Sequence, residues 1–348
     1  MFINFGSSVT KCSIIFDPNA NFRFVNSWEK RHFGVQGNNW NGRVSFPNNI
    51  YSMRVNNSKQ LNKKVTFLYN STNNYTFIDA FMGCSKFNQP FTFPPRVSNM
   101  YNAFRGCSAL KANIQMPTEF GGEMSNVFQG CTQFNQNVAF PIQGGSNLTN
   151  TFTLCRMFNQ PLEIPDYVTS MTMTFTGCNN LNANIKISNN CKILNGTFSN
   201  CINLNQNIKI PQSVTNMDYT FWRCFNLNQN IQIPNNVTNI RSAFNVCPNL
   251  NHNLFIPNSV TDMTMAFQDC SRLSNLTFAP GIANNVAYNA IRDNATQSLN
   301  IWTDPTTAAN LMTTALIQRV SSPLTYETIT NGYYNSQYNL YIYTNAFS

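Results

Sequence analysis

Apolar and polar positions along this chain follow a pattern that repeats about every 23 residues. In the copy that begins at Cys201, the apolar pair Ile208 and Ile210 flanks one polar residue, and Pro211 follows. Apolar residues at every second position predict a short strand, and proline ends it because proline cannot donate a hydrogen bond to the ladder. Each repeat, which we call a rung, therefore predicts one short strand.

The remainder of the rung predicts a return segment. Met217 and Phe221 are four residues apart, and this spacing favours a helical turn. The same order of apolar residues follows Cys224 and Cys247. A unit of about 20 to 30 residues cannot bury its apolar face alone, so the rungs must stack on one another. The sequence thus predicts a solenoid with a long parallel sheet, whose strands lie about 4.8 Å apart.

Nine cysteines mark the period. They recur at intervals of 23 or 24 residues and form what we call the cysteine ladder: Cys84, Cys107, Cys131, Cys155, Cys178, Cys201, Cys224, Cys247 and Cys270. An odd number of equivalent thiols at a core position favours buried, reduced side chains over disulfides. Cys12 and Cys191 lie outside the ladder, and neither they nor His32 and His252 have metal-ligand spacing. No metal site and no cofactor are predicted.

Four elements recur in one frame within the rungs: Cys-x-x-Leu, Ile-x-Ile-Pro, Val-Thr-x-Met and Phe-x-x-Cys. Together they resemble the BspA-like class of leucine-rich repeats over roughly residues 77–280. The strings Phe87 to Pro90 and Phe158 to Pro161 are similar to related short Asn-rich repeats of amoebal and viral proteins. The loop from Leu204 to Ile208 is one residue longer than in the usual bacterial form. The resemblance implies a leucine-rich-repeat solenoid that recognises partners on its sheet face.

The pattern divides the chain into four regions. We expect a β-rich N-terminal cap over residues 1–35 and degenerate repeats that lack the cysteine over 36–76. A nine-rung solenoid follows over 77–280, and a mixed α+β C-terminal cap over 281–348. In the first region, Ser13–Phe16 and Phe22–Val25 flank a turn-forming stretch and predict a hairpin. Such a cap would cover the apolar end of the stack.

The C-terminal cap is expected to combine a helix with a hairpin. Asp304, which is followed by proline, is a helix start signal, and apolar residues come after it at helical spacing. Further on, Leu324–Thr330 and Tyr333–Tyr343 are predicted strands joined at Asn331-Gly332. The tyrosines of this region either pack within the cap or form a contact surface, and the sequence favours neither.

Composition and charge narrow the choice of partner. Charged residues make up only 10% of the 348, and asparagine takes about one position in six, so we expect Asn side chains to bond backbone groups at the turns. The net charge is +9, and residues 1–70 hold nine Lys or Arg against two acidic residues. No zinc finger, Arg-rich helix or RNA-binding signature accompanies them. This basic end therefore favours a solvated face or an acidic partner over nucleic acid.

Catalysis and membrane insertion have no support in the sequence. The chain has no catalytic triad motif, phosphate-binding glycine loop or His-Glu-x-x-His string, and its thirteen acidic residues are scattered. It has no apolar run of about 18 residues, and its start lacks the pattern of a secretory signal. We expect no enzyme and no membrane span.

Two surfaces are candidate binding sites. The residue between the inward pair of each strand points outward and varies, and these positions form what we call the sheet-face row: Thr92, Gln115, Ala139, Glu163, Lys186, Lys209, Gln232, Phe255 and Thr277. We select six of them as binding residues, namely Gln115, Glu163, Lys186, Lys209, Gln232 and Phe255. The second candidate, on the seventh rung, is the aromatic–arginine cluster of Tyr219, Trp222, Arg223 and Phe225, whose composition is typical of interface anchors. For the sheet-face row, the alternative is a merely solvated polar face. For the aromatic–arginine cluster, the alternative is packing against an adjacent cap or rung.

These features predict a non-enzymatic recognition or structural protein. The first hypothesis is a surface component of a bacteriophage virion, in the tail or capsid, because a solenoid with free thiols and no export signal suits assembly in the host cytoplasm. The alternatives are a bacterial or protist cell-surface adhesin or antigen, and an intracellular scaffold. The expected partner is a protein of the virion or of the host surface. A glycan is an alternative ligand, and the oligomeric state stays open.

Overall fold

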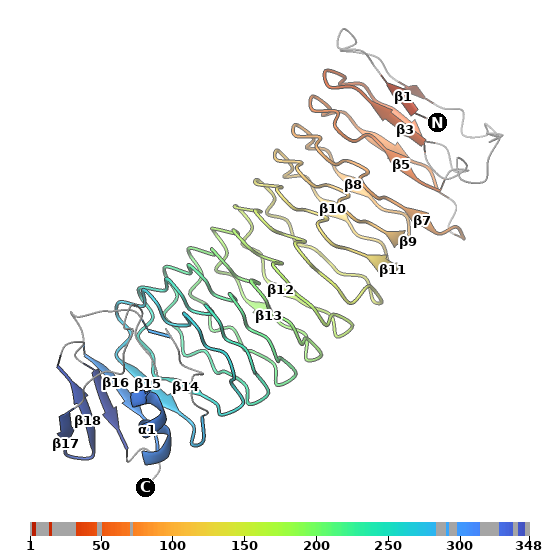
Figure 1. The fold of residues 1–348 in the computed structure, drawn as a ribbon. Helices are drawn as coiled ribbons and strands as arrows, with labels where there is room; N and C mark the ends of the chain where they lie inside the picture. Colours follow the sequence, from red (N-terminus) through yellow and green to blue (C-terminus); the bar gives the residue numbers. More distant parts are fainter. Residues whose placement is uncertain are drawn as a thin grey trace. The chain divides into compact units, whose positions relative to one another are not determined.

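The computed structural model describes residues 2–4, 14–15, 33–46, 51–69, 72–282, 290–291, 298–313, 327–336 and 340–344. The chain divides into two units: unit 1 is Met1–Ser170 with Thr174–Leu181, and unit 2 is Met171–Met173 with Asn182–Ser348. In each unit the rungs stack with their strands parallel (Figure 1). The predicted solenoid of stacked parallel strands is confirmed.

Unit 1 begins with two parallel sheets of three strands each. The first contains β1 (Phe2–Asn4), β3 (Phe33–Gln36) and β5 (Met53–Arg54), and the second β2 (Ile14–Ile15), β4 (Val44–Phe46) and β6 (Val65–Phe67). Val44 lies opposite Val65, and Phe46 lies opposite Phe67, with all four side chains buried. Because β2 pairs with β4, the first strand of the expected N-terminal hairpin joins the stack. The second, Phe22–Val25, lies outside the described residues.

Further along unit 1, two successive rungs contribute strands to two sides, as β8 (Phe91–Thr92) with β9 (Arg96–Asn99) and β10 (Ile114–Gln115) with β11 (Glu119–Glu123). One side contains β8, β10 and β12 (Leu162–Glu163), at the predicted strand positions. The other side is a parallel sheet of β7 (Tyr75–Thr76), β9 and β11. The sequence did not predict this second strand, because its residues lack a strict period of two.

The β11 strand contains a bulge that depends on glycine. Two residues, Gly121 and Gly122, lie opposite the single Ser98 of β9. A Cβ atom at Gly122 would collide with the carbonyl oxygen of Ser98, whereas a Cβ at Gly121 would meet nothing within 4 Å. The two neighbouring glycines therefore differ in what they tolerate.

We expect Gly122→Ala to destabilise unit 1 by roughly 1–3 kcal/mol, because the strand must move to relieve the collision with Ser98. Urea unfolding followed by circular dichroism measures this change. Gly121→Ala is the matched control, and its unfolding midpoint should stay near that of the parent protein. Equal effects of the two substitutions would show that the bulge does not have this geometry.

The return segment is not helical, which corrects the prediction for Met217–Phe221. Alternate backbone N–H groups donate to the next rung, from Met217 to the Asn239 carbonyl at 2.8 Å and from Phe221 to the Ala243 carbonyl at 2.8 Å. The N–H groups between them close turns within the rung, as Thr220 does to the Met217 carbonyl at 3.1 Å. We call these turns, which are hydrogen-bonded from one rung to the next, the turn stack. An apolar spacing of four residues occurs both in a helical turn and in the turn stack, so the spacing alone does not distinguish the two structures.

A column of phenylalanine side chains forms the centre of each unit. In unit 1, ring centroids lie 4.8 Å apart for Phe81 and Phe104, 5.8 Å for Phe104 and Phe128, and 5.6 Å for Phe128 and Phe152. Unit 2 has an equivalent column at 5.5 to 5.6 Å, made of Phe198, Phe221, Phe244 and Phe267. These are the phenylalanines of the Phe-x-x-Cys element, so one side chain per rung continues the core.

The ladder cysteines are free and buried, which confirms the interpretation of them as core thiols. The structure adds a hydrogen bond that the sequence did not predict: the thiol donates to a backbone carbonyl of the preceding rung, as from Cys131 to Phe104 at 3.1 Å. Burial raises the pKa of Cys84 and of Cys270 to about 12. Outside the ladder, Cys191 is also buried and has a pKa raised by burial to about 11. Cys12 lies outside the described residues.

Asparagine side chains bond the backbone of the next rung, as predicted. The Asn228 N–H donates to Asn205 Oδ1 at 2.8 Å, and the Asn251 N–H donates to Asn228 Oδ1 at 3.0 Å. In unit 1, the Asn88 N–H donates likewise to Asn62 Oδ1 at 2.9 Å. The high asparagine content therefore satisfies backbone groups at loops that no regular secondary structure reaches.

Unit 2 begins with β13 (Ile185–Lys186) and ends in a six-stranded sheet. The sheet has the order β14, β15, β16, β19, β18, β17, with bounds Leu254–Ile256, Asn275–Phe278, Leu299–Trp302, Leu340–Tyr343, Gly332–Asn335 and Glu327–Ile329. Between β13 and this sheet, residues 208–210 and 231–233 are not in strands, although Ile208 and Ile231 are buried. The predicted long sheet is therefore interrupted, because burial alternation persists without ladder hydrogen bonds.

The C-terminal elements largely follow the sequence. The helix α1 spans Pro305–Thr313, and Asp304 Oδ1 caps it by accepting from the N–H groups of Thr306 at 2.9 Å and Thr307 at 3.1 Å. The predicted hairpin is confirmed as β17 and β18, but its two-residue turn is Thr330–Asn331, one residue earlier than expected. Gly332 belongs to β18, where a Cβ would collide with the carbonyl oxygen of Ile342.

The expected strand Tyr333–Tyr343 is two strands. The first part lies in β18 and the last in β19, and the two pair in antiparallel orientation. β19 also pairs in parallel with β16, so it joins the hairpin to the stacked strands. A run of tyrosines with strand propensity does not reveal a reversal inside it.

Candidate functional site

The sheet-face row of unit 1 is exposed as predicted. Gln115 and Glu163 are exposed, while the apolar residues beside them, Ile114 and Leu162, are buried. Thr92 lies directly opposite Gln115 on the adjacent strand, and its hydroxyl donates to Gln115 Oε1 at 3.3 Å. The parallel strands thus bring neighbouring members of the row into contact across rungs.

A shallow hollow of about 360 Å³ interrupts this face between two rungs of unit 1. Its lining includes Asn113 and Gln115 from one rung, with Asn137, Ala139 and Ile142 from the next. Ile142 is 88% exposed, which is unusual for a large aliphatic side chain. The hollow offers amide groups beside an apolar side chain, a combination suited to a peptide.

In unit 2, Lys186, Lys209, Gln232 and Phe255 are all exposed. Phe255 is 40% exposed and lies opposite Thr277, which in turn lies opposite Trp302. The sheet-face row therefore continues beyond the last rung into the C-terminal sheet.

The sequence analysis missed Trp302 and Tyr343 as members of the row. They lie opposite each other on β16 and β19, and their rings stack with centroids 4.4 Å apart. Next to them, Tyr341 stacks on Tyr343 at 6.1 Å and on Tyr334 at 4.5 Å. All four side chains are half-buried. The alternation of apolar residues around Trp302 and Tyr343 could have placed them on the outward face, but only the pairing of β16 with β19 places them side by side.

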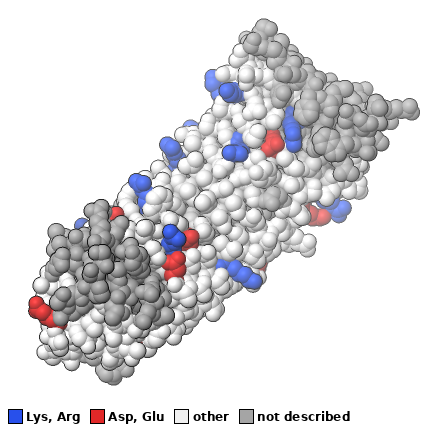
Figure 2. All heavy atoms as spheres, viewed as in Figure 1, with Lys and Arg blue, Asp and Glu red and all other residues white. Residues whose placement is uncertain are grey.

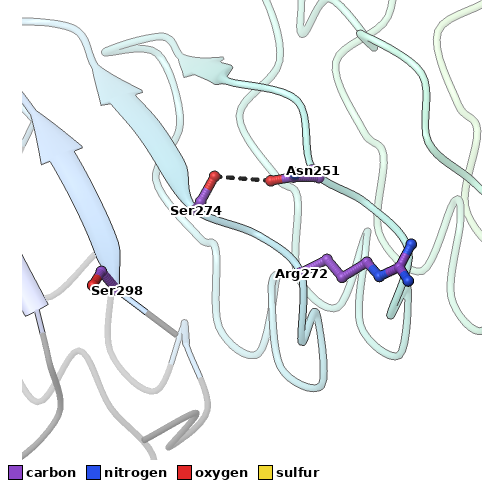
Figure 3. A pocket seen from close by; sticks show the side chains of 4 residues that line it. All are labelled: Asn251, Arg272, Ser274 and Ser298. Atoms are coloured by element: carbon purple, nitrogen blue, oxygen red, sulfur yellow. Dashed lines mark hydrogen bonds between the residues drawn. The ribbon is translucent and has the colours of Figure 1, made fainter. Parts of the chain in front are cut away.

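A second hollow, of about 450 Å³, lies in unit 2 (Figure 3). It is lined by Asn251, Arg272, Ser274 and Ser298, and the Ser274 hydroxyl donates to Asn251 Oδ1 at 2.8 Å. The lining is polar and can form hydrogen bonds with a ligand. No residue of this hollow was among the predicted sites.

The structure brings the side chains of the aromatic–arginine cluster together. The guanidinium carbon of Arg223 lies 5.4 Å from the ring centroid of Trp222 and 5.8 Å from that of Phe225. The rings of Tyr219 and Trp222 meet edge to face, with centroids 6.1 Å apart and an interplanar angle of 88°. These side chains project from the return segment of the rung, whereas the sheet-face row lies on the strand segment.

Charged side chains are few on the described surface (Figure 2). Of the basic residues near the N-terminus, Arg43, Lys63 and Lys64 are exposed, whereas Arg54 pairs with Asp79 at 3.6 Å. Within the described ranges, no three His, Cys, Asp or Glu side chains form a group that could hold a metal ion. None of the helices among those same residues has the length and hydrophobicity that crossing a membrane requires.

Comparison with known families gives two matches. The BspA-type leucine-rich-repeat region, in six copies, matches residues 148–274, 192–314 and 241–344, which together cover more than half of the chain. A Mycoplasma protein family of unknown function, DUF285, matches residues 94–187. No curated protein matches the sequence significantly.

Three solved structures are similar to this chain. A leucine-rich-repeat protein from Bacteroides ovatus is 20% identical, with 65% of this chain and 71% of that chain covered and a TM-score of 0.48. A leucine-rich cell-surface protein from Faecalibacterium prausnitzii is 18% identical, with 79% and 83% covered and a TM-score of 0.44. The pneumococcal vaccine antigen PcpA is 15% identical, with 94% and 79% covered and a TM-score of 0.49.

Proposed function

The chain belongs to the BspA-type leucine-rich-repeat family, and from this we propose that it is a non-enzymatic recognition protein that binds a partner protein through its sheet-face row. The main contacts are assigned to Lys186, Lys209, Gln232 and Phe255 in unit 2. In unit 1, Gln115 and Glu163 are the corresponding contacts. Stacked repeats present extended surfaces that suit the binding of another macromolecule.

One observation carries this proposal: the chemistry of the row changes from rung to rung, while its neighbours stay apolar and buried. Ile208 and Ile210 on either side of Lys209 are both buried, so the fold depends on them and not on the lysine. Two lysines, an amide and an exposed phenylalanine on successive rungs offer cationic, polar and apolar contacts to one partner. Phe255, at 40% exposure, supplies the apolar anchor.

The buried thiols support binding over catalysis. Burial raises the pKa of Cys247 well above its ordinary value, so the sulfur stays protonated at neutral pH. A nucleophilic cysteine requires the reverse, a lowered pKa and access to solvent. The most numerous reactive side chains of the core are therefore structural.

We propose a bacteriophage virion as the setting, with a bacterial or protist cell surface as the alternative and an intracellular scaffold as the third. The free cysteines support the first, since thiols stay reduced in a protein that folds and assembles in the cytoplasm. The identity of the partner distinguishes the three settings. A capsid or tail protein favours the virion, a cell-wall protein of the organism that makes this chain favours the cell surface, and an intracellular protein favours the scaffold.

The test places a photo-cross-linking amino acid at Gln232 and mixes the protein with particles and cells from its source. We expect one partner protein to be cross-linked and identified by mass spectrometry. Gln212 is the matched control, because it is an exposed glutamine of the preceding rung that lies outside the row. Equal cross-linking from both positions would contradict the proposal. Periodate oxidises glycans, so loss of binding after periodate treatment of the cells would indicate that the ligand is a glycan.

Replacing Lys186, Lys209, Gln232 and Phe255 together by alanine should weaken binding to that partner at least about tenfold, since it removes the whole strip of contacts. Stability should change by less than about 1 kcal/mol, because all four side chains are exposed. Calorimetry of binding and of unfolding measures both. Unchanged affinity would remove the row from consideration.

A further inference from the structure

The aromatic–arginine cluster holds a cation whose guanidinium N–H groups form no hydrogen bond or ion pair with another residue in the described part of the chain. Arg223 is exposed, and its guanidinium carbon lies over the ring of Trp222 at 5.4 Å and over that of Phe225 at 5.8 Å. The ion pairs among the described residues are Arg54 with Asp79 and Arg96 with Glu119, so none of them includes Arg223. Contacts with ring faces orient a guanidinium without using its N–H groups.

The backbone keeps this arrangement in place. The Arg223 N–H donates to the Asn245 carbonyl at 2.8 Å, and the Asn200 N–H donates to the Trp222 carbonyl at 2.6 Å. On the far side, Asn249 Nδ2 donates to the Phe225 carbonyl at 2.9 Å. The cluster is thus bonded to the rung before it and to the rung after it. A guanidinium that is oriented in advance loses less conformational entropy on binding.

The neighbouring rungs carry smaller side chains at the positions equivalent to Trp222 and Arg223. One period before and after Trp222 stand Ser199 and Asn245, and the positions equivalent to Arg223 hold Asn200 and Val246. The large aromatic side chains therefore stand beside small or polar ones. Tyr219 is 36% exposed and meets Trp222 edge to face, so it adds a hydroxyl and a ring edge at the border.

We infer that the aromatic–arginine cluster is a binding site for a carboxylate on an acidic side chain of a partner protein. The planar fork of Arg223 matches two carboxylate oxygens, and Trp222, Phe225 and Tyr219 contact the apolar part of the same segment. The cluster contains one cation and not several, which fits a singly charged carboxylate better than a phosphate dianion. The net charge of +9 also favours approach by an acidic partner.

The site is independent of the sheet-face row, so the two proposals can fail separately. The quadruple alanine variant of the row should retain carboxylate binding at Arg223. Conversely, loss of this site should leave the cross-link from Gln232 unchanged.

The experiment follows the side-chain Nε–Hε resonance of Arg223 by NMR in the full chain while acetyl-Ala-Glu-Ala-amide is added. We expect a saturable shift with the Glu peptide and none with the matched Gln peptide. Arg223→Lys keeps the charge but removes the fork and should weaken binding, read by calorimetry, about tenfold. Arg241→Lys is the matched control, because Arg241 is an exposed arginine of the same unit that lies outside the cluster, and it should leave the affinity unchanged.

Three results would overturn the inference. They are equal affinity for the Glu and Gln peptides, unchanged affinity in Arg223→Lys, and tighter binding of inorganic phosphate than of the Glu peptide. The first two would deny the carboxylate contact, and the third would assign the cluster to another class of anion. Circular dichroism of each variant verifies that the fold is retained.

Discussion

Raising the pH from about 8 to about 10.5 should unfold both units of this protein, because the buried thiols cannot ionise in the folded state. Burial raises the pKa of Cys84 and Cys270 to about 12 and that of Cys107 well above the ordinary value of 9.0. Below about pH 9, the ladder thiols are protonated in both the folded and the unfolded state, so they do not reduce the free energy of unfolding. Above it, only the unfolded chain loses thiol protons, so stability falls as the pH rises.

The expected loss is large because each unit holds several such thiols. Each one lowers the free energy of unfolding by about 1.4 kcal/mol per pH unit between its unfolded and folded pKa values. Four or five per unit, as in the run from Cys84 to Cys178, would remove about 6 kcal/mol per pH unit, comparable with the whole stability of a domain. Urea unfolding at a series of pH values measures the slope.

A variant with Cys107→Ala, Cys131→Ala and Cys155→Ala separates thiols from the tyrosines and lysines that also titrate in this range. The triple variant loses stability at every pH because cavities replace the sulfur atoms. Its pH slope in unit 1 should nevertheless be shallower by about 4 kcal/mol per pH unit. A slope equal to that of the parent protein would mean that the ladder thiols are not what limits stability at high pH.

Phe128→Ala should destabilise unit 1 by about 3–5 kcal/mol, since it removes one ring from the central column. Phe128 is fully buried, and its ring lies 4.5 Å from that of Phe134 and 5.6 Å from that of Phe152, measured between centroids. Because each rung contacts only its neighbours, the cavity interrupts the stack at one position. Thermal unfolding should then show an earlier transition for this unit.

Ile142→Ala is the matched control for that substitution. Ile142 belongs to the same unit and is a large apolar residue, but it is 88% exposed. Its replacement should change the free energy of unfolding by less than about 0.5 kcal/mol. A similar loss for both variants would show that the phenylalanine column is not a principal source of stability.

The core residues could be predicted because equivalent positions of successive repeats hold the same kinds of apolar residue. The inward positions Ile208 and Ile210, the column residue Phe221 and the ladder cysteine Cys224 were all identified from the period, and all are buried. In a stack of rungs, a residue contacts residues about 23 positions away in the sequence. A regular repeat therefore predicts which residues are in tertiary contact. The cap at Asp304 was predictable for a local reason, since its partners lie two and three residues away.

The backbone between the core positions was less predictable. Tyr219 and Arg223 adopt positive φ values of 54° and 60°, which no rule based on side-chain type assigns to such residues. The hydrogen bonds to the next rung require those angles, and they form only when the rungs are stacked. The same holds at Gly332, whose place is decided by the close approach of β19 and not by the Asn-Gly pair.

By itself, the sequence determined the solenoid class, the rung length and the buried thiols, and it identified the outward positions of the row from Thr92 to Thr277, because these depend on apolar periodicity and composition. Tertiary structure decided the second strand of the unit 1 rungs, the turn stack and the contact of Trp302 with Tyr343. It also decided that Arg223 contacts the faces of two rings. These features depend on backbone angles and strand pairings that become favourable only when distant segments meet, so a local pattern does not contain them.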